Sequence, residues 1–457
     1  MTIHKLPISY NKQTPVGAVH IDPYSFLIYD KLFEDVKFIT PSHQNWLQDM
    51  PISAQTSSLN VAKKSEESPQ RLLSSKKFTD LFKLDSKRKF VLYSPLDPPY
   101  KINPLAYLMN SPTIAHAYEN KRYFRDEFAD LIRMPEYEIK YMNELDKAAA
   151  YRDLRDQFGS FVLQDEESSG SKGTYVIHSH DDYVDAIRAL KKFSRGRTIV
   201  ASKFVKGEVS SIQVCITKYG VFSGGIQRQL VDSKHLCNPS LEGASRWCGG
   251  EMGTDYPDIV QHQSQEIATI VGSELASHGY KGIFGVDLIV TPENEVYAIE
   301  INARLTGYSH IISDMQLLEN KIPFMLLHAL ELGNFNYEVD DLEALPSNGG
   351  RYQKPVSLLI INNPLDEEFV MNQYVKPGVY RFRGGKVSFV KPGYSVEDLQ
   401  GEDTMLIFCR YNQGESIDAG KRIVKVIKFG EVMNKGDLAP KSRALVKAIK
   451  EHFELPA

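Results

Sequence analysis

Hydrophobic and polar positions predict alternating helices and strands over the first three quarters of the chain. Short Val/Ile-rich runs bounded by Gly or Pro indicate strands, and apolar positions every three or four residues indicate helices. A helix and a strand are expected within residues 24–39. Further strands are expected at 89–94, 161–164 and 174–177, and paired strands at 197–216 and 282–307. Further helices are expected at 111–134, 181–193, 257–278 and 311–331.

The pattern changes after residues 347–350, where short strands alternate with turns and a final helix covers 439–453. These strands are expected at 356–361, 378–382, 386–390, 405–410 and 422–429. The stretch 53–75 is polar and is expected to form a flexible insertion. The change after 347–350 predicts a separate C-terminal domain at 347–457.

Residues 282–307, GIFGVDLIVTPENEVYAIEINARLTG, read as a β-hairpin around a turn at 291–294. If Val290 pairs with Glu295, strand alternation places four polar side chains on one face. The other face then packs on the core. The polar face carries Asp287, Glu300, Asn302 and Arg304, and the core face carries Val286, Leu288, Val290, Tyr297, Ile299 and Ile301.

The two acids of this hairpin predict a metal site. Two carboxylates about 5 Å apart on a half-buried face repel by roughly 3 kcal/mol at an effective dielectric constant near 20. A cation between them removes that cost, and oxygen-only ligands from Asp287, Glu300 and Asn302 suit Mg²⁺ bridging to phosphate. The alternative is an amphipathic hairpin with solvated acids.

Composition narrows the classes of function. The chain has 457 residues, 42% of them hydrophobic, with 54 Lys and Arg against 58 Asp and Glu, a net charge of −4. We therefore expect no nucleic-acid or membrane partner. The N-terminus lacks the apolar core of a signal peptide, and four scattered cysteines show neither disulfide nor zinc spacing. A cytoplasmic location is the expectation.

Two segments upstream of the hairpin have the composition of a nucleotide site. Glycines and serines at 167–174, between two expected strands, can present backbone N–H groups to an anion, with Lys172 adding charge. Residues 203–205 form a bend whose backbone can contact a base, and Glu208 follows it as a candidate for ribose hydroxyls. Each segment by itself is equally compatible with an ordinary turn.

The order of strand, Gly/Ser loop, strand, Gly-Glu hinge and Asp…Glu-x-Asn-x-Arg resembles the ATP-grasp superfamily of carboxylate ligases. The resemblance covers about residues 115–310. It implies an α/β (α+β) ATP-grasp fold with a preceding α/β domain at 1–115 and a two-lobed nucleotide clamp at 116–346, whose lid lobe covers about 150–205. The C-terminal domain at 347–457 would then be β-rich and end in a helix. It also implies ATP as a substrate and Mg²⁺, with Mn²⁺ as an alternative ion.

The resemblance assigns roles to particular residues. Asp287, Glu300 and Asn302 would hold the metal, and Arg304 would face the transferred phosphoryl group or the carboxylate substrate. Gly307 would shape the substrate floor, and Lys172 would join Arg304 in stabilising charge. ATP would contact Lys121, Gln164, Ser168, Ser169, Gly170, Ser171, Gly173, Lys203, Phe204, Val205 and Glu208.

Two positions depart from the family pattern. Gln164 stands where the strand before the loop usually carries a phosphate-binding lysine, and Ser202 stands where the hinge usually opens with an acid.

The resemblance implies that a carboxylate, such as an amino acid or peptide, becomes an acylphosphate and then joins an amine. Arg228 is a candidate to bind the substrate carboxylate. The alternative is that Arg228 forms an ion pair at the protein surface.

Two rival functions stay open at this point. A carboxylase-type enzyme would activate bicarbonate, and a regulator would bind the nucleotide without turnover. The sequence names neither the acid nor the acceptor, and a homodimer is an option that it does not decide.

Overall fold

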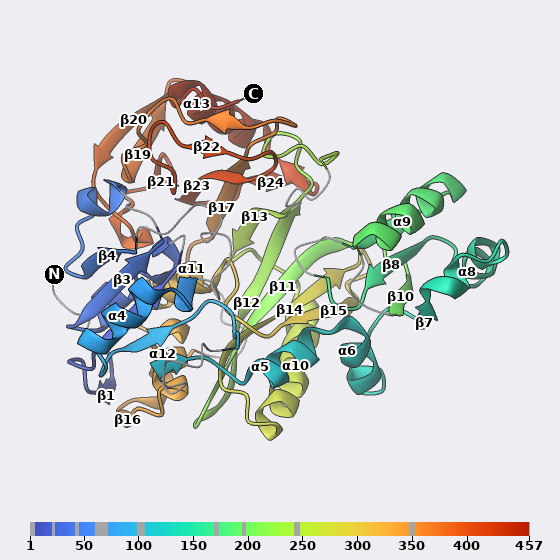
Figure 1. Cartoon of the computed structure of the whole chain (residues 1–457), viewed down its shortest axis with the longest axis horizontal. Coiled ribbons are helices and arrows are strands. Elements are labelled where there is room, and N and C mark those ends of the chain that lie inside the picture. The colour runs from blue at the N-terminus through green and yellow to red at the C-terminus, as the bar shows by residue number, and fades with distance from the viewer. Residues whose placement is uncertain are drawn as a thin grey trace.

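The computed structural model describes residues 5–20, 23–41, 45–59, 72–97, 106–168, 173–193, 198–241, 247–346 and 352–456. Figure 1 shows a main body from which a smaller lobe projects, formed by β7–β10 with α8 and α9. Helices and several sheets together make a mixed α/β fold, as the sequence predicts. No helix among the described residues is both long and apolar enough to cross a bilayer.

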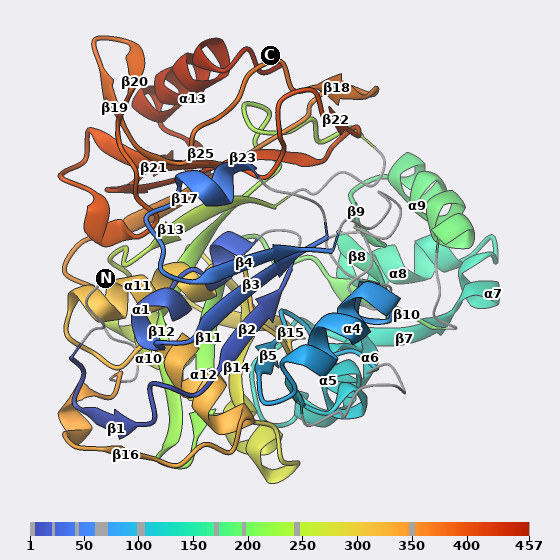
Figure 2. The same ribbon diagram turned by 60° about the vertical axis from the view of Figure 1, so that its left-hand side comes forward.

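The N-terminal part forms a five-stranded parallel sheet in the order β4-β3-β2-β5-β6, visible in the blue region of Figure 2. Its strands are β2 (Val16–Val19), β3 (Val36–Thr40), β4 (Gln55–Ser58), β5 (Lys89–Val91) and β6 (Tyr107–Leu108). Its helical segments are η1 (Pro23–Phe26), α1 (Tyr29–Leu32), η2 (Asn45–Asp49) and α4 (Lys76–Leu84). Because 55–58 pair with β3, a flexible insertion is the wrong description of these four residues. Residues 60–71 of that stretch lie outside the described part.

The projecting lobe, here called the lid, is a four-stranded sheet in the order β7-β10-β8-β9. Its strands are β7 (Tyr137–Tyr141), β8 (Phe161–Asp165), β9 (Thr174–Ile177) and β10 (Thr198–Lys203). Helices α7 (Met142–Leu145), α8 (Ala150–Phe158) and α9 (His180–Phe193) accompany it. Its apolar core, which includes Phe161, Leu163 and Leu190, is separate from the cores of the main body.

The main body is organised by one ten-stranded sheet that joins the central and C-terminal parts. Strand β13 pairs with β17 through Gly249↔Leu359 and Met252↔Val356, so the C-terminal strands extend the central sheet. The central strands are β11 (Glu208–Thr217), β12 (Gly220–Val231), β13 (Trp247–Met252), β14 (Gly282–Val290) and β15 (Val296–Asn302). The C-terminal strands are β17 (Val356–Asn362), β19 (Gly378–Arg383), β20 (Lys386–Lys391), β21 (Thr404–Cys409) and β23 (Arg422–Phe429).

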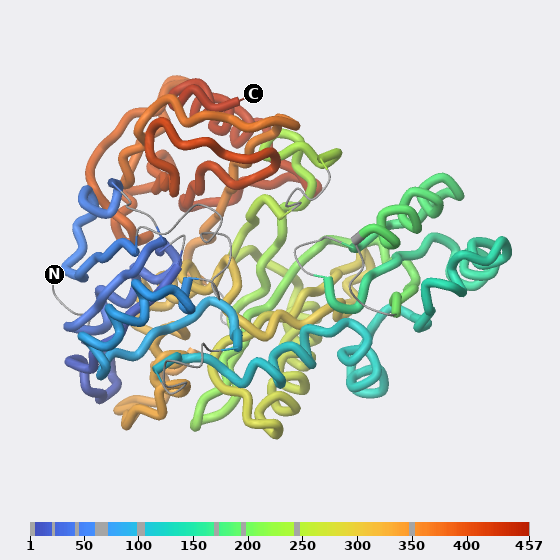
Figure 3. The backbone as a smooth tube through the Cα atoms, viewed as in Figure 1, coloured from blue at the N-terminus to red at the C-terminus, as the bar shows by residue number. Residues whose placement is uncertain are grey.

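Small two-stranded ladders and one long helix complete the fold. The ladders pair β1 (Ile8–Tyr10) with β16 (Tyr337–Val339), β18 (Phe369–Val370) with β22 (Ser416–Ile417), and β24 (Met433–Asn434) with β25 (Asp437–Leu438). Single-turn helices η4 (Leu342–Ala344) and η5 (Val396–Asp398) lie between strands. The terminal helix α13 (Pro440–His452) lies at the red end of the chain in Figure 3.

Two segments predicted as continuous helices are each broken in two. The first becomes α5 (Pro112–Glu119) and α6 (Lys121–Phe128), because the Asn120 side chain accepts from the Tyr123 N–H (2.9 Å) and starts a new helix. The second becomes α11 (Ser309–Leu318) and α12 (Phe324–Leu332), separated before Pro323. The predicted helix at 257–278 is α10 (Asp258–Ser277).

The hairpin β14–β15 adopts a register that differs from the predicted one. Val290 pairs with Val296, and a β-bulge then brings Asp287 directly opposite Glu300. Leu288 pairs with Ala298, so Ile299 is the extra residue on its strand. The bulge keeps Asp287 and Glu300 together but changes the faces of Tyr297 and Ile299. The prediction that these two pack in the core is wrong: Ile299 lines a pocket, and Tyr297 contacts Arg133.

His328 in α12 provides an acid-sensitive element of the core. Its Nδ1 accepts the Ile283 N–H (2.9 Å), and burial lowers its pKa to about 3 from 6.5. The unfolded chain therefore binds more protons below pH 6.5, and folding stability should fall by about 1.4 kcal/mol per pH unit from there towards pH 3. Above pH 6.5 this histidine adds no pH dependence.

We expect His328→Asn, which keeps an acceptor for Ile283, to remove this contribution. Between pH 6.5 and 5, urea unfolding of wild type should lose roughly 2 kcal/mol more than unfolding of the variant. Parallel stability curves for the two proteins would contradict the assignment.

Candidate functional site

A pocket of about 330 Å³ lies between the lid and the central sheet. We call it the inter-lobe pocket. The lid, helix α6 and strands β11–β15 all contribute to its walls. Its polar lining includes Lys121, Gln164, Ser168, Lys203, Asp287 and Glu300, which the sequence predicts as site residues. The fold thus brings together residues that are almost 180 positions apart in the chain.

The acidic floor of the inter-lobe pocket is formed by Asp287 and Glu300, cross-strand neighbours on the same sheet face. The Gln229 amide donates to Asp287 Oδ1 (3.0 Å), and the Asn302 amide donates to Asp287 Oδ2 (3.0 Å). Lys121 Nζ lies 3.4 Å from Glu300 Oε2 and also donates to the Ser168 carbonyl (2.5 Å). The two acids are therefore held by amide donors and by one buried lysine.

Burial and charge act differently on the two acids. Burial, reinforced by the neighbouring Glu300, raises the pKa of Asp287 to about 7. Burial also opposes ionisation of Glu300, but Lys121 and Arg304 outweigh it and lower the pKa of that carboxyl. The pair thus carries concentrated negative charge that a further cation would stabilise.

Arg304 connects this floor to helix α5. Its guanidinium donates to Asn302 Oδ1 (2.7 Å), and its Nε lies 3.2 Å from Glu119 Oε1. Burial raises the pKa of Glu119, although Arg304 opposes that shift. Arg304 therefore orients Asn302 and holds a guanidinium beside the two acids. Glu119 is a member of this cluster that the sequence interpretation missed.

The opposite end of the inter-lobe pocket is apolar and suits a flat ring. Its lining includes Val162, Val176, Phe204, Val205, Val209, Ile289 and Ile299. Val176 and Val209 are 38% and 36% exposed, which leaves apolar surface for a ligand to cover.

The predicted hinge at 203–205 has one backbone donor left for a ligand. The N–H groups of Lys203 and Phe204 donate to the carbonyls of Glu136 and Ser160 (both 2.9 Å). Within the described residues the Val205 N–H has no acceptor, so it can bind a ring nitrogen. The Lys203 ammonium lies 3.1 Å from Glu136 Oε1 and is partly neutralised.

The Gly/Ser loop begins beside Lys121, which donates to the Ser168 carbonyl. Gly173 has a φ of +73°, and its carbonyl accepts the Asp165 N–H (2.9 Å), which closes the neck of the loop. A Cβ at Gly173 would lie 2.9 Å from the Ser168 side chain, so glycine is required there. The tip of the loop, Ser169, Gly170, Ser171 and Lys172, lies outside the described residues.

Two residues predicted to contact ligands lie outside the inter-lobe pocket. Glu208 and Arg228 project from the sheet face opposite Asp287 and do not line the inter-lobe pocket. Arg228 is ion-paired with Glu208 (2.8 Å) and with the fully buried Glu251 (3.1 Å), and Tyr256 donates to Glu208. They form an internal charge cluster because adjacent strand residues point to opposite faces.

The alternation of side chains along the strands also explains which pocket residues the sequence interpretation missed. Gln229, next to Arg228 in the chain, faces the pocket and binds Asp287. Trp247 is half-buried and also lines the pocket. A Cβ at Gly307 would overlap the Trp247 indole, so the absence of a side chain at Gly307 leaves room for the ring. The Tyr308 ring packs edge-to-face on that indole (5.1 Å between centroids).

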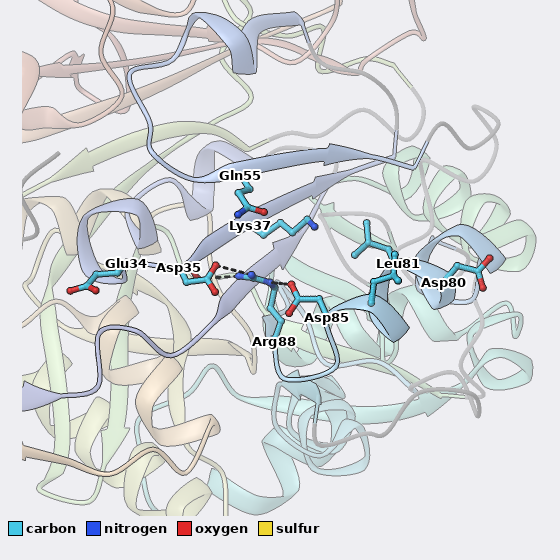
Figure 4. A pocket seen from close by; sticks show the side chains of 9 residues that line it. Glu34, Asp35, Lys37, Gln55, Asp80, Leu81, Asp85 and Arg88 are labelled. Carbon is cyan, nitrogen blue, oxygen red and sulfur yellow. Dashed lines mark hydrogen bonds and ion pairs between the residues drawn. The ribbon is translucent and has the colours of Figure 1, made fainter.

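A wider hollow of about 730 Å³ on the N-terminal domain contains none of the predicted site residues. Figure 4 shows Arg88 between two acids of this hollow, at 2.7 Å from Asp35 and 2.5 Å from Asp85. Because its buried cation is already neutralised, we place the functional site in the inter-lobe pocket.

Sequence comparison agrees with this placement. Residues 118–308 match the ATP-grasp domain family. This part of the chain is an ATP-grasp domain. The match begins before the lid and ends after Gly307, so it contains every predicted site residue. No curated protein shows significant sequence similarity to this ATP-grasp chain.

Solved structures show the same fold over nearly the whole length. L-amino acid ligase from Bacillus licheniformis is 14% identical, with a TM-score of 0.58 and 98% of each chain covered. Phosphoribosylamine–glycine ligase from Thermotoga maritima is 14% identical, with a TM-score of 0.56 and 95% of each chain covered. The biotin carboxylase domain of 2-oxoglutarate carboxylase from Hydrogenobacter thermophilus is 11% identical, with a TM-score of 0.58, covering 94% of this chain and 87% of that one. At these identities the likeness establishes the fold, not the substrates.

Proposed function

We propose that this ATP-grasp protein is an ATP-dependent ligase that activates a carboxylate as an acylphosphate and couples it to an amine, releasing ADP and phosphate. The observation that carries the proposal is the convergence of Asp287 and Glu300 with Lys121 in a pocket that also has an apolar slot. Such a site can hold the charged tail of a nucleotide at one end and its base at the other.

The acidic floor fits Mg²⁺. Asp287 and Glu300 supply carboxylate oxygens from paired positions on one sheet face. Asn302, whose oxygen accepts from Arg304 and whose amide donates to Asp287, would add an amide oxygen if its side chain turned. Within the described residues no group of three or more His, Cys, Asp or Glu side chains forms an all-protein cage. Mg²⁺ typically takes one or two carboxylates and completes its shell with water and phosphate. When bound, it would neutralise phosphate charge during transfer.

The chain's own residues would then position the reactants and neutralise charge. The Val205 N–H and the apolar slot bind the base, and Lys121 supplies positive charge beside Ser168, where the Gly/Ser loop begins. The acid oxygen attacks the γ-phosphorus, and the bond from that phosphorus to the β-γ bridging oxygen breaks to release ADP. The amine then attacks the acyl carbon, phosphate leaves and the amine loses a proton. Arg304 is placed to stabilise the transferring charge.

An organic acid and an amine are the proposed substrates, with amino acids or short peptides as the first candidates. The similarity to an L-amino acid ligase over the full length of both chains supports this choice. Bicarbonate is the second candidate, because the carboxylase domain that shares the fold was solved with bicarbonate. The regulator hypothesis predicts binding without turnover.

The reaction type can be tested by hydroxylamine trapping. Full-length protein is incubated with ATP, Mg²⁺, hydroxylamine and pools of amino acids, and hydroxamate and ADP are measured. We expect hydroxamate to form only with the correct acid, in an amount equal to the ADP. ADP release that requires bicarbonate and gives no hydroxamate would replace the proposal by the carboxylase alternative. Tight ATP binding without ADP release under all conditions would favour a regulator.

A further inference from the structure

Arg125 in helix α6 is a buried cation that the proposed chemistry has not used. Its side chain is fully buried, yet it lines the inter-lobe pocket. One terminal nitrogen donates to the Ile299 carbonyl (2.9 Å), and the other donates to Gln164 Oε1 (3.2 Å). Nε has no hydrogen-bond partner within the described residues.

No carboxylate of the described residues lies within ion-pairing distance of Arg125, which contacts a carbonyl, an amide and the rings of Phe124 and Tyr137. Glu300 lies farther away and favours the charged form of the guanidinium. Burial lowers its pKa to about 10, so the guanidinium stays charged at neutral pH. A buried charge that lacks a counter-ion in direct contact is costly unless another ion binds beside it. Arg88 and Arg228, by contrast, each contact two acids.

The neighbours of Arg125 indicate that an anion would bind beside it. It is one helical turn from Lys121, so both cations lie on the same buried face of α6. Arg125 holds Gln164 by its oxygen, which directs the Gln164 amide donors towards Thr174 Oγ1 (3.4 Å), at the end of the Gly/Ser loop. Arg125, Gln164 and Thr174 therefore form a chain of hydrogen bonds, and all three residues line the pocket together with Lys121.

We propose that Arg125 is a phosphate-positioning residue of this chain, which supplies the positive charge for the nucleotide tail and orients Gln164 as the group that contacts it. This inference rests on the proposed function, in that it takes the inter-lobe pocket to bind a nucleotide. It also explains why position 164 holds a neutral amide: a lysine there would place two cations about 3 Å apart, a cost of several kcal/mol at low dielectric.

The test is the affinity of the full-length protein for ADP, ATP and adenosine, measured by calorimetry with Mg²⁺. Arg125→Met should weaken ADP and ATP binding about tenfold or more and leave adenosine binding within about twofold. Arg122→Met, on the exposed side of the same helix, is the matched control and should bind like wild type. Unchanged ADP affinity in Arg125→Met would overturn the proposal.

A double variant separates charge from packing. Arg125→Met with Gln164→Lys returns a cation to the same wall but does not restore the bond to the Ile299 carbonyl. We expect it to recover most of the ADP affinity lost in Arg125→Met. Recovery of none would show that Arg125 acts by holding the bulge at Ile299 and would overturn the proposal.

A third variant covers the case in which Arg125→Met does not fold. Gln164→Glu gives Arg125 a carboxylate, so the protein should melt at a higher temperature while binding ADP about tenfold more weakly. ADP binding equal to wild type in that variant would overturn the proposal. A wild type that binds adenosine, ADP and ATP with no measurable affinity would instead refute the proposed function itself.

Discussion

Glu300→Gln is expected to abolish Mg²⁺-dependent ATP turnover while the protein stays folded. Glutamine keeps the size of the side chain but removes one of the two carboxylate charges that face the pocket. A bound metal supplies several kcal/mol of charge stabilisation, so the rate should fall by about 10³-fold or more. The fold should survive because the neutral side chain ends the repulsion with Asp287, whose pKa is raised to about 7 partly by Glu300.

The measurement is ADP release as a function of Mg²⁺ concentration, together with thermal unfolding. Glu293→Gln, on the exposed turn of the same hairpin, is the matched control and should be fully active. If Glu300→Gln turned over ATP at the wild-type rate, the acidic floor would not be the metal site.

Arg304→Lys is expected to lower the turnover rate about 100-fold and to leave ATP affinity within about threefold. The guanidinium reaches Asn302 (2.7 Å) and Glu119 (3.2 Å) together, and a single ammonium lacks the second donor in the required geometry. Misplacing Asn302 and removing one transition-state donor should therefore affect the chemical step more than nucleotide binding.

Single-turnover kinetics and ATP calorimetry separate these two effects. Arg381→Lys provides the matched control, because Arg381 pairs with Asp403 (3.2 Å) at the exposed surface. A variant with normal turnover and weakened ATP binding would show that Arg304 serves the nucleotide and not the transferred group.

Sequence patterns predicted the strands that form this site better than they predicted which side chains face the pocket. The polar face of residues 282–307 follows from strand alternation, and Asp287 and Glu300 do lie together. The same reasoning failed for Tyr297 and Ile299, because a bulge shifts the register by one residue. It also selected Arg228 where Gln229 faces the pocket. A one-residue error reverses a side chain, and no local signal shows where a bulge occurs.

The breaks in two predicted helices had local causes that the sequence contains. Asn120 and Pro323 both mark helix starts, but the apolar periodicity on either side continues across them. The joining of the C-terminal strands to the central sheet had no such signal. The pairing of β13 with β17 links residues more than one hundred positions apart, and it depends on how the sheet edges meet.

The sequence by itself determined the identities and spacing of the acids, the glycines of the loop and the hinge, because these follow from backbone geometry and local charge. Only the tertiary structure decided which cations serve the pocket. It pairs Arg228 with Glu208 and Glu251 on the far face of the sheet, and it buries Arg125 beside Gln164 with no directly paired acid among the described residues. The physical reason is that the electrostatic role of a charge depends on its neighbours in space and on its removal from water, neither of which is written in its local sequence.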